Sequence, residues 1–144
     1  ALVSVGGNLR AIGTKPDGSQ WTGGVENPWN ASDVYNSDSM LGDPINMSDM
    51  ALVTSGDYQR TYLVDGEYYH HIIDPETLMP ARYWRSVTVV CADSGIADAL
   101  STALFLLPQD EGQALLTRYS AEAMWLDADG GEFFSPGFRE ILRT

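Results

Sequence analysis

The sequence predicts an α+β fold in which two helices pack against a mostly antiparallel β-sheet. Most of the chain consists of short segments rich in β-branched and aromatic residues, separated by Gly, Asn, Asp and Pro, which is typical of strands joined by tight turns. Two adjacent segments near the C-terminus instead have helical spacing of their apolar residues. A chain of 144 residues, 44% of them hydrophobic, is long enough to bury one core. We therefore expect a single α+β domain over residues 1–144.

The N-terminal part of the chain predicts several strands and one long irregular segment. Strands are expected over residues 1–5, 9–12, 20–26 and 50–54, and a long loop containing a short strand over residues 27–46. Gly6, Gly7 and Asn8 give a tight-turn signal between the first two strands. Such a turn needs no other role, although backbone without side chains also lets a ligand approach closely.

Residues 54–77, with the sequence TSGDYQRTYLVDGEYYHHIIDPET, contain a strong hairpin signal. An Asp-Gly pair at positions 65–66 separates two segments of high strand propensity, over residues 59–64 and 67–73. Both positions of a two-residue hairpin turn favour positive φ, which Asp and Gly tolerate. A β-hairpin with its turn at Asp-Gly is therefore predicted.

This hairpin places both histidines of the chain on its second arm. His70 and His71 are neighbours in the sequence, so in a strand they point to opposite faces and one of them alone can face a given site. We also expect the hairpin to bring residues 55–57 close to residues 74–75. The candidate functional residues of this half of the chain would then lie together at one end of the hairpin.

The C-terminal half predicts a central strand, two helices and a second hairpin. The expected elements are a strand over residues 86–92, helices over 95–107 and 110–119, strands over 123–126 and 132–134, and a helical turn over 137–142. Asp93 or Ser94 is the expected N-cap of the first helix, and Pro108 closes it. The residues expected on its buried face are Ile96, Leu100, Ala103, Leu104 and Leu107, and those on the opposite face are Asp98, Ser101, Thr102 and Phe105.

Charge and cysteine content exclude some classes of function. The net charge is −12 and no basic run is present, which argues against nonspecific nucleic-acid binding. An anionic ligand would need a metal ion, a helix N-terminus or placed arginines such as Arg60, Arg82 and Arg85. The single cysteine, Cys91, lies in an apolar run and excludes an intramolecular disulfide. The chain begins within a strand and without Met, so we interpret it as a fragment or a processed chain.

Two groups of residues are suited to chemistry. Asp98 and Thr102 are four positions apart, hence neighbours on one helix face, and supply the oxygen ligands that Mg²⁺ prefers. The alternative is that they belong to the solvated face of the helix. His71 has the residue type of a general base at neutral pH. The alternative is a strand histidine bonded to backbone.

Five segments together resemble the ApbE family of FAD-dependent flavin transferases, also called thiamine-biosynthesis lipoproteins. The matching segments are residues 3–8 (VSVGGN), 54–60 (TSGDYQR), 71–75 (HIIDP) with Thr77, 86–89 (SVTV) and 97–104 (ADALSTAL). They occur in the order of the family. The sequence LMPA at residues 78–81 is similar to the Gram-positive branch of the family. An upstream half of the family, with its Ala-Lys-Gly-Tyr segment, has no counterpart, so the chain resembles the C-terminal half of a transferase.

The resemblance implies an activity and roles for individual residues. Members of the family move FMN from FAD onto a Ser or Thr hydroxyl of an acceptor flavoprotein, release AMP and use Mg²⁺. By resemblance, Asp98 and Thr102 are metal ligands and His71 is the catalytic histidine. The residues expected to contact FAD are Gly6, Gly7, Asn8, Ser55, Gly56, Arg60 and Ile72.

Alternatives to the transferase stay open from the sequence. They are a protein that binds FAD without cleaving it, a Mg²⁺-dependent FAD pyrophosphatase, and a structural domain without a ligand. Whether the chain is active without the upstream half is also open. The resemblance further implies an extracytoplasmic lipoprotein, held at the membrane by an upstream lipid anchor.

Overall fold

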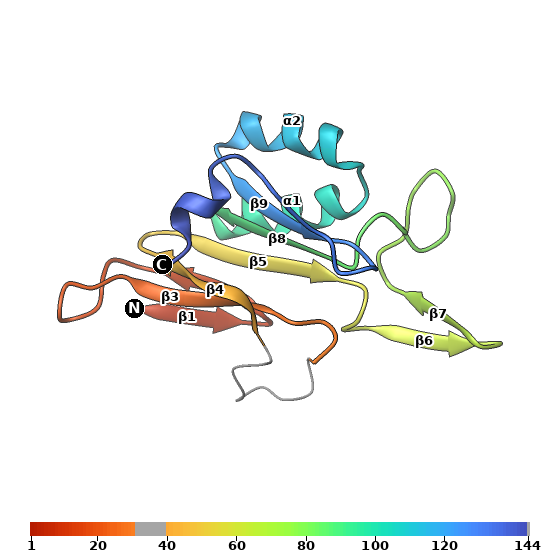
Figure 1. The fold of residues 1–144 in the computed structure, drawn as a ribbon, viewed down its shortest axis with the longest axis horizontal. Coiled ribbons are helices and arrows are strands. Elements are labelled where there is room, and N and C mark those ends of the chain that lie inside the picture. The colour runs from red at the N-terminus through yellow and green to blue at the C-terminus, as the bar shows by residue number, and fades with distance from the viewer. Residues whose placement is uncertain (31–39, 144) are drawn as a thin grey trace.

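A six-stranded antiparallel sheet forms the centre of the protein, as a computed structural model describes it for residues 1–30 and 40–143 (Figure 1). Its strands are, in spatial order, β1 (Leu2–Val5), β2 (Asn8–Ala11), β5 (Ala51–Gly56), β8 (Ser86–Cys91), β9 (Glu122–Leu126) and β10 (Glu132–Phe134). Each neighbouring pair is antiparallel. The predicted α+β class with a mostly antiparallel sheet is confirmed.

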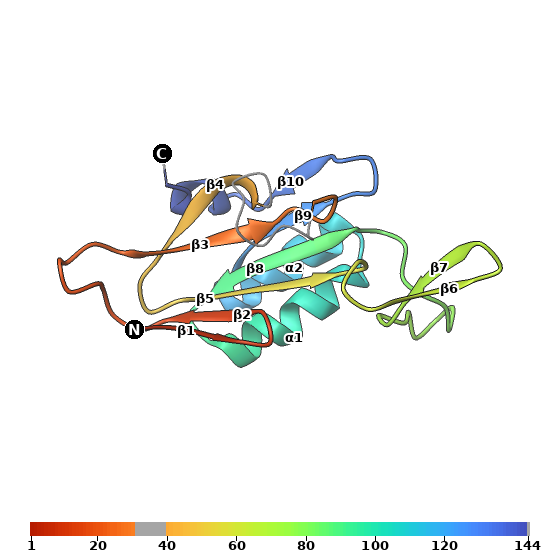
Figure 2. The ribbon, with the colours of Figure 1, turned by 90° about the horizontal axis from the view of Figure 1, so that it is seen from below.

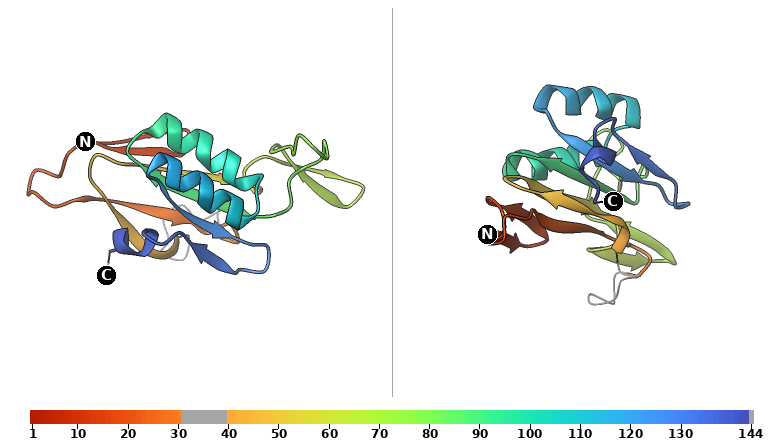
Figure 3. Two further views of the ribbon diagram at one scale, coloured as in Figure 1. Left: turned by 90° about the horizontal axis from the view of Figure 1, so that it is seen from above. Right: turned by 60° about the vertical axis from the view of Figure 1, so that its left-hand side comes forward.

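The two faces of this sheet are covered by different layers (Figures 2 and 3). The elements on one face are α1 (Ser94–Phe105) and α2 (Gln109–Tyr119), and those on the other are the strand pair β3 (Trp21–Glu26) and β4 (Met40–Met47) and a 3₁₀ helix (Phe138–Ile141). Neither α-helix in the described part of the chain is long and apolar enough to cross a membrane. The two predicted helices therefore pack on one side of the sheet.

The central strand β8 explains the order of the layers. All six of its residues are buried, as its continuous apolar sequence predicted. Val87 and Val89 pack into the cluster under the helices, whereas Val90 packs into the cluster under β3 and β4. Successive strand residues point to opposite faces. A strand that is apolar on both faces must be covered on both, so the sheet lies between two layers.

The predicted hairpin is present and projects from the end of the sheet as a separate two-stranded unit (Figures 1 and 2). It consists of β6 (Thr61–Val64) and β7 (Glu67–His70). Its turn residues Asp65 and Gly66 have φ of 50° and 83°, the left-handed values that a two-residue turn requires. The turn signal in the sequence was therefore correct.

Two predicted strand boundaries were wrong. β4 covers Met40–Met47, where a loop with a short strand was expected, because pairing with β3 imposes extended backbone on a segment of weak strand pattern. Residues 31–39 of the expected loop lie outside the described residues. Ser55 and Gly56 belong to β5, where they pair with Val87 and Ser86, and the hairpin begins after them.

The expected buried face of the first helix was also partly wrong. Its buried residues are Ala97, Leu100, Ser101, Leu104 and Phe105. Ser101 is fully buried because its hydroxyl makes hydrogen bonds inside the protein, which removes the cost of burying a polar group. Ile96 is 38% exposed. Of the two N-cap residues that the sequence allowed, Asp93 and Ser94, the N-cap is Asp93, whose carboxylate accepts a hydrogen bond from the backbone N–H of Ile96 (2.9 Å).

The packing of α1 on the sheet makes a first prediction. Leu104 is completely buried between α1 and the sheet, so Leu104→Ala should lower the free energy of unfolding by roughly 2–5 kcal/mol. Leu63→Ala, on the exposed hairpin, should change it by less than about 0.5 kcal/mol. Urea denaturation followed by circular dichroism measures both. Equal effects of the two substitutions would contradict the described core.

Candidate functional site

Several of the predicted site residues meet beside α1. The Asn8 side-chain N–H donates to Asp98 Oδ1 (3.1 Å), and the hydroxyls of Ser55 and Ser101 lie 2.7 Å apart. The hydroxyl of Ser55 also lies 3.4 Å from that of Thr102. We call these five residues, Asn8, Ser55, Asp98, Ser101 and Thr102, the α1 polar cluster. It joins β2, β5 and α1 through side chains that are up to ninety positions apart in the sequence.

Backbone geometry places each member of this cluster. Gly6 and Gly7 have φ of 58° and 92°, which closes the β1–β2 turn and starts β2 at Asn8. Ser55 lies on β5, whose side chains alternate between the two faces of the sheet, and it points toward α1. Asp98 and Thr102 are one helical turn apart on α1 and both are exposed. The cluster therefore presents a carboxylate and a hydroxyl to solvent from a helix that is packed on the sheet.

The oxygen atoms of this cluster fit a Mg²⁺ ion. A carboxylate with hydroxyl oxygens is hard ligation, and Mg²⁺ commonly takes one or two carboxylates and completes its shell with water and phosphate oxygens. Oδ2 of Asp98 makes no hydrogen bond within the described residues, and Asp98 and Thr102 are open to solvent. No group of three or more His, Cys, Asp or Glu that could hold a metal occurs in the described part of the chain. The residues present would supply part of a magnesium shell.

The two histidines have different surroundings, but the second arm of the hairpin is shorter than predicted, because β7 ends at His70 and His71 lies outside it. His70 Nε2 donates to the carbonyl of Ala81 (2.8 Å), and its ring packs edge-on against Phe105 with centroids 5.5 Å apart. His71 is exposed and Ile72 is buried. Phe105 is in the last turn of α1, one turn beyond Thr102, so its contact with His70 ties the second arm of the hairpin to the helix that carries the cluster.

The other predicted FAD contacts lie between the sheet and the hairpin. Gly56 is buried, and a Cβ atom there would collide with the ring of Tyr58, so any side chain at this position would force that ring to move. Arg60 is exposed at the start of the hairpin. The structure brings Asn8 and Ser55 to Asp98 and Thr102, but it records no contact of Arg60, His71 or Ile72 with that cluster.

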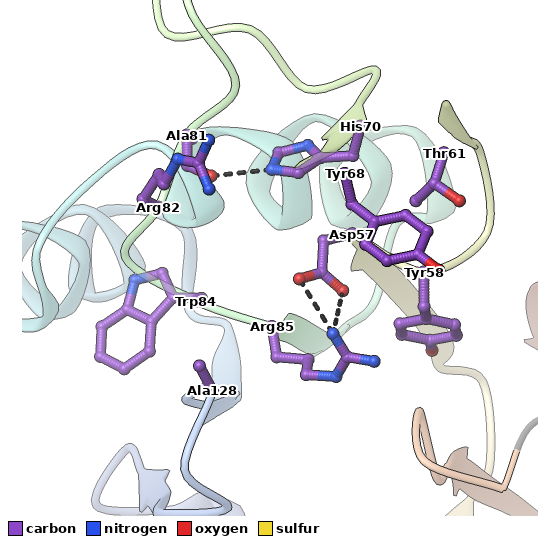
Figure 4. Close-up of a pocket in the computed structure, with 10 residues that line it drawn as sticks. All are labelled: Asp57, Tyr58, Thr61, Tyr68, His70, Ala81, Arg82, Trp84, Arg85 and Ala128. Carbon is purple, nitrogen blue, oxygen red and sulfur yellow. Dashed lines mark hydrogen bonds and ion pairs between the residues drawn. The ribbon is translucent and has the colours of Figure 1, made fainter. Parts of the chain in front are cut away.

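A pocket that the sequence did not predict lies under the hairpin (Figure 4). It has a volume of about 530 Å³ and is lined by Asp57, Tyr58, Thr61, Tyr68, His70, Ala81, Arg82, Trp84, Arg85 and Ala128. Residues 55–57 and 74–75 were expected to lie close together, but Asp57 lines this pocket whereas Asp74 and Pro75 line a different one. The pocket forms where the hairpin, the segment before β8 and the β9–β10 turn meet, a juxtaposition that no local sequence signal marks.

Two of the residues that line this pocket, Asp57 and Arg85, form an ion pair. Arg85 Nη1 donates to both carboxylate oxygens of Asp57, at 3.1 and 3.2 Å, and Arg85 also stacks on the ring of Trp29 with 5.6 Å between guanidinium carbon and ring centroid. Arg85, a candidate phosphate ligand by its residue type, is therefore already paired. Burial raises the pKa of the Asp57 carboxyl, and Arg85 opposes this rise. Burial and the neighbouring Glu26 raise the pKa of Tyr58.

Comparison with known proteins gives a consistent result. The model of the ApbE family matches residues 1–125. The FAD:protein FMN transferase of Treponema pallidum is 35% identical over 148 residues, which cover 100% of this chain and 41% of that protein.

Two solved structures have the same arrangement of elements. The ApbE protein of Thermotoga maritima superposes with a TM-score of 0.86 at 34% identity, over 100% of this chain and 45% of that one. The flavin transferase ApbE of Vibrio cholerae superposes with a TM-score of 0.74 at 32% identity, over 98% and 44% of the two chains. The chain therefore spans less than half the length of these relatives.

The Asp57–Arg85 pair makes a second prediction. The native pKa of Asp57 should lie above the ordinary 3.8, so its contribution to the free energy of unfolding should fall as pH rises from 3.8 through that native pKa. Arg85→Gln removes a cation that favours the carboxylate and should raise the pKa further. NMR titration of the Asp57 carboxyl measures both values. An unchanged or lower pKa in Arg85→Gln would contradict the pairing, and Asp57→Asn should abolish this part of the pH dependence.

Proposed function

The chain belongs to the ApbE family, and from this membership we propose that it forms part of an enzyme that transfers FMN from FAD to a Ser or Thr hydroxyl of an acceptor protein, releasing AMP. The names of the relatives support flavin transfer. The observation that carries the proposal for this chain is the α1 polar cluster, in which Asp98 and Thr102 present exposed oxygen ligands beside Asn8 and Ser55.

Asp98 and Thr102 are the proposed ligands of Mg²⁺. A bound Mg²⁺ would neutralise charge on the pyrophosphate of FAD. This matters here because the chain carries a net charge of −12, which repels an anionic substrate. The open β1–β2 turn at Gly6 and Gly7 has no atom within 4 Å of a Cβ position at either glycine, so a ligand has room to approach the backbone there.

His71 is the proposed general base. In the proposed step, the acceptor hydroxyl oxygen forms a bond to the FMN-side phosphorus, the bond from that phosphorus to the bridging oxygen breaks, and AMP leaves. The proton of the hydroxyl passes to His71 as the new bond forms, since a neutral hydroxyl is a poor nucleophile. The exposure of His71 beside the hairpin supports this role, because the base must reach a hydroxyl that arrives from another molecule.

Hydrolysis of FAD is the second candidate. Both Asp98 and Thr102 are exposed to solvent, which favours the entry of water at the same place. Water attacking the same phosphorus would give free FMN and AMP. The two activities differ in the acceptor alone, so product analysis distinguishes them.

We also propose that the chain corresponds to the C-terminal part of a transferase of the Gram-positive branch. The chain covers 41–45% of the length of these relatives, which supports the proposal that it corresponds to one part of a transferase. By the same family argument, we propose that the full-length protein acts outside the cytoplasm and is held at the membrane by a lipid anchor upstream of this segment. A full-length gene product without a signal peptide and lipobox cysteine would contradict this location.

The metal assignment makes a third prediction, for the full-length gene product that carries this chain. Asp98→Ala removes the charged metal ligand and should abolish both FAD turnover and Mg²⁺ binding measured by calorimetry. Asp110→Ala removes an equally exposed carboxylate from α2 and should change neither. Full turnover and Mg²⁺ binding in Asp98→Ala would exclude Asp98 from the site.

The assignment of the base makes a fourth prediction. His71→Ala should retain FAD binding and lower flavin transfer by roughly 100-fold or more, because proton removal is lost while the binding groups remain. In-gel flavin fluorescence of a Thr-bearing acceptor and an FAD titration measure the two effects. Glu76→Ala, in the exposed loop that follows, is the control and should transfer at the wild-type rate. Wild-type labelling by His71→Ala would show that another group takes the proton.

A further inference from the structure

The β6–β7 hairpin has two free edges within the described part of the chain. β6 pairs with β7, and neither strand pairs with another strand. Its side chains are also unusually open for apolar residues, with Tyr62 73%, Leu63 61% and Tyr68 66% exposed. An unpaired strand edge offers backbone N–H and C=O groups to an extended polypeptide. The hairpin is therefore a surface on which another strand can be added.

The register identifies which backbone groups are free. Val64 and Glu67 close a two-residue turn and form a hydrogen-bonded pair, so hydrogen-bonded and non-bonded pairs alternate from there. Tyr68 on β7 and Leu63 on β6 form the next, non-bonded pair. The N–H and C=O groups of Tyr68 and His70 therefore point to the outer edge of β7, and those of Leu63 point to the outer edge of β6.

Tyr68 and His70 of β7 line the pocket of Figure 4, together with Thr61 of β6. Just beyond β7, Ile72 accepts a backbone hydrogen bond from Ala81 (3.0 Å), and Ile73 bridges Pro80 in antiparallel orientation. The two segments then separate at Ala81, because the chain turns away to Arg85 and β8. The pocket lies in the gap, with Tyr68 and His70 from β7 on one side and the segment from Ala81 to Arg85 on the other.

The pocket holds two arginines in an acidic protein. Of the eight Lys and Arg residues of the chain, Arg82 and Arg85 line this one pocket. Arg85 is paired with Asp57. Arg82 is exposed and makes no ion pair within the described residues. One cation is therefore available to a carboxylate that enters from solvent.

We propose that the acceptor polypeptide binds as an added strand on the outer edge of β7, with an acidic side chain directed at Arg82. This proposal rests on the proposed transfer to a protein hydroxyl. In the added strand, side chains alternate between the pocket face, which carries Tyr68 and His70, and the opposite face, which carries Tyr69. The proposal assigns His71, the exposed residue that directly follows β7, to this opposite face. The hydroxyl residue must then stand an odd number of positions from the acidic residue, so that it lies on the face of His71.

An extended polypeptide fits this surface better than a small anion does. A small anion would use Arg82 and leave the backbone groups of Tyr68 and His70 unpaired, whereas a strand satisfies both. The added strand must end beside His70, because Ala81 and Pro80 already pair with Ile72 and Ile73. Its end therefore lies close to His71, the residue that directly follows β7. A polypeptide held there presents its hydroxyl next to the proposed base.

Proline substitutions in the full-length protein test the edge. Tyr68→Pro removes the outward N–H of β7 without removing a hydrogen bond to β6, and should weaken binding of a short peptide with one Asp next to one Thr about tenfold. Leu63→Pro makes the matched change on the edge of β6 and should bind like wild type. Tyr68→Ala removes the ring but keeps the N–H, and should bind more tightly than Tyr68→Pro. Fluorescence anisotropy without FAD measures the affinities, and circular dichroism confirms folding.

Peptide variants test the charge and the register. Arg82→Gln should weaken binding of the Asp peptide about fivefold and leave a peptide with Asn in its place unchanged. A peptide with Asp and Thr two positions apart should bind like the adjacent one but receive less flavin, as measured by mass spectrometry. Equal binding by wild type, Tyr68→Pro and Arg82→Gln would overturn the proposal, as would equal loss in Leu63→Pro and Tyr68→Pro.

If something other than an acceptor polypeptide occupies the edge of β7, these experiments give different results. A dimer that Tyr68→Pro converts to a monomer would assign the edge to a second copy of the chain. Failure of wild type to bind any peptide, with the Tyr68 amide protected from hydrogen exchange, would assign it to other residues of the same protein. Both results overturn the proposal. Free FMN and AMP as the sole products, with peptide still bound at β7, would instead contradict the proposed transfer and leave the docking edge standing.

Discussion

The packing of α1 on β5 and β8 is the constraint on which the candidate site depends. β8 is apolar on both faces, so one face must take the helices and the other must take β3 and β4. At this contact Ser55 of β5 meets Ser101 of α1, and two hydroxyls bonded to each other replace an apolar contact. Together with the burial of Leu100 and Leu104, that bond sets the rotation of the helix. With the rotation fixed, Asp98 comes within hydrogen-bond distance of Asn8, and Thr102 comes close to Ser55.

The second organising feature is the way the chain leaves β7. His70, the last residue of β7, lines the pocket, His71 is exposed, and Ile72 joins the core. A one-residue change of register would exchange the two histidines. The Asp-Gly turn fixes the register, and the bond from His70 to the Ala81 carbonyl holds the end of the arm. Two neighbouring histidines can therefore serve different purposes without moving.

Membership in the ApbE family places these features in a larger protein context. The chain matches the relatives over less than half of their length, yet it contains the α1 polar cluster, the hairpin and the pocket. The cluster offers one carboxylate, which is fewer than a metal ion with a full protein shell would need. This donor set is suited to a substrate that brings its own phosphate oxygens. We therefore propose separate roles for the two features. The cluster would bind the metal ion that neutralises the charge of the phosphates, and the hairpin would bind the acceptor polypeptide.

The sequence by itself determined the fold class, the Asp-Gly hairpin and the central strand that begins at Ser86, and it limited the N-cap to Asp93 or Ser94. Each of these depends on local propensity or on a repeated apolar pattern. It also picked out Asp98 and Thr102 as neighbours, since helical spacing alone makes them so.

What the tertiary structure decided depends on partners distant in the chain. The burial of Ser101 depends on a hydroxyl from β5, and the strand over residues 40–47 depends on pairing with β3. The pairing of Arg85 with Asp57 and the pocket around it arise where three separate segments meet. Each of these contacts joins residues that are far apart in the sequence. No local pattern of residues could therefore predict them.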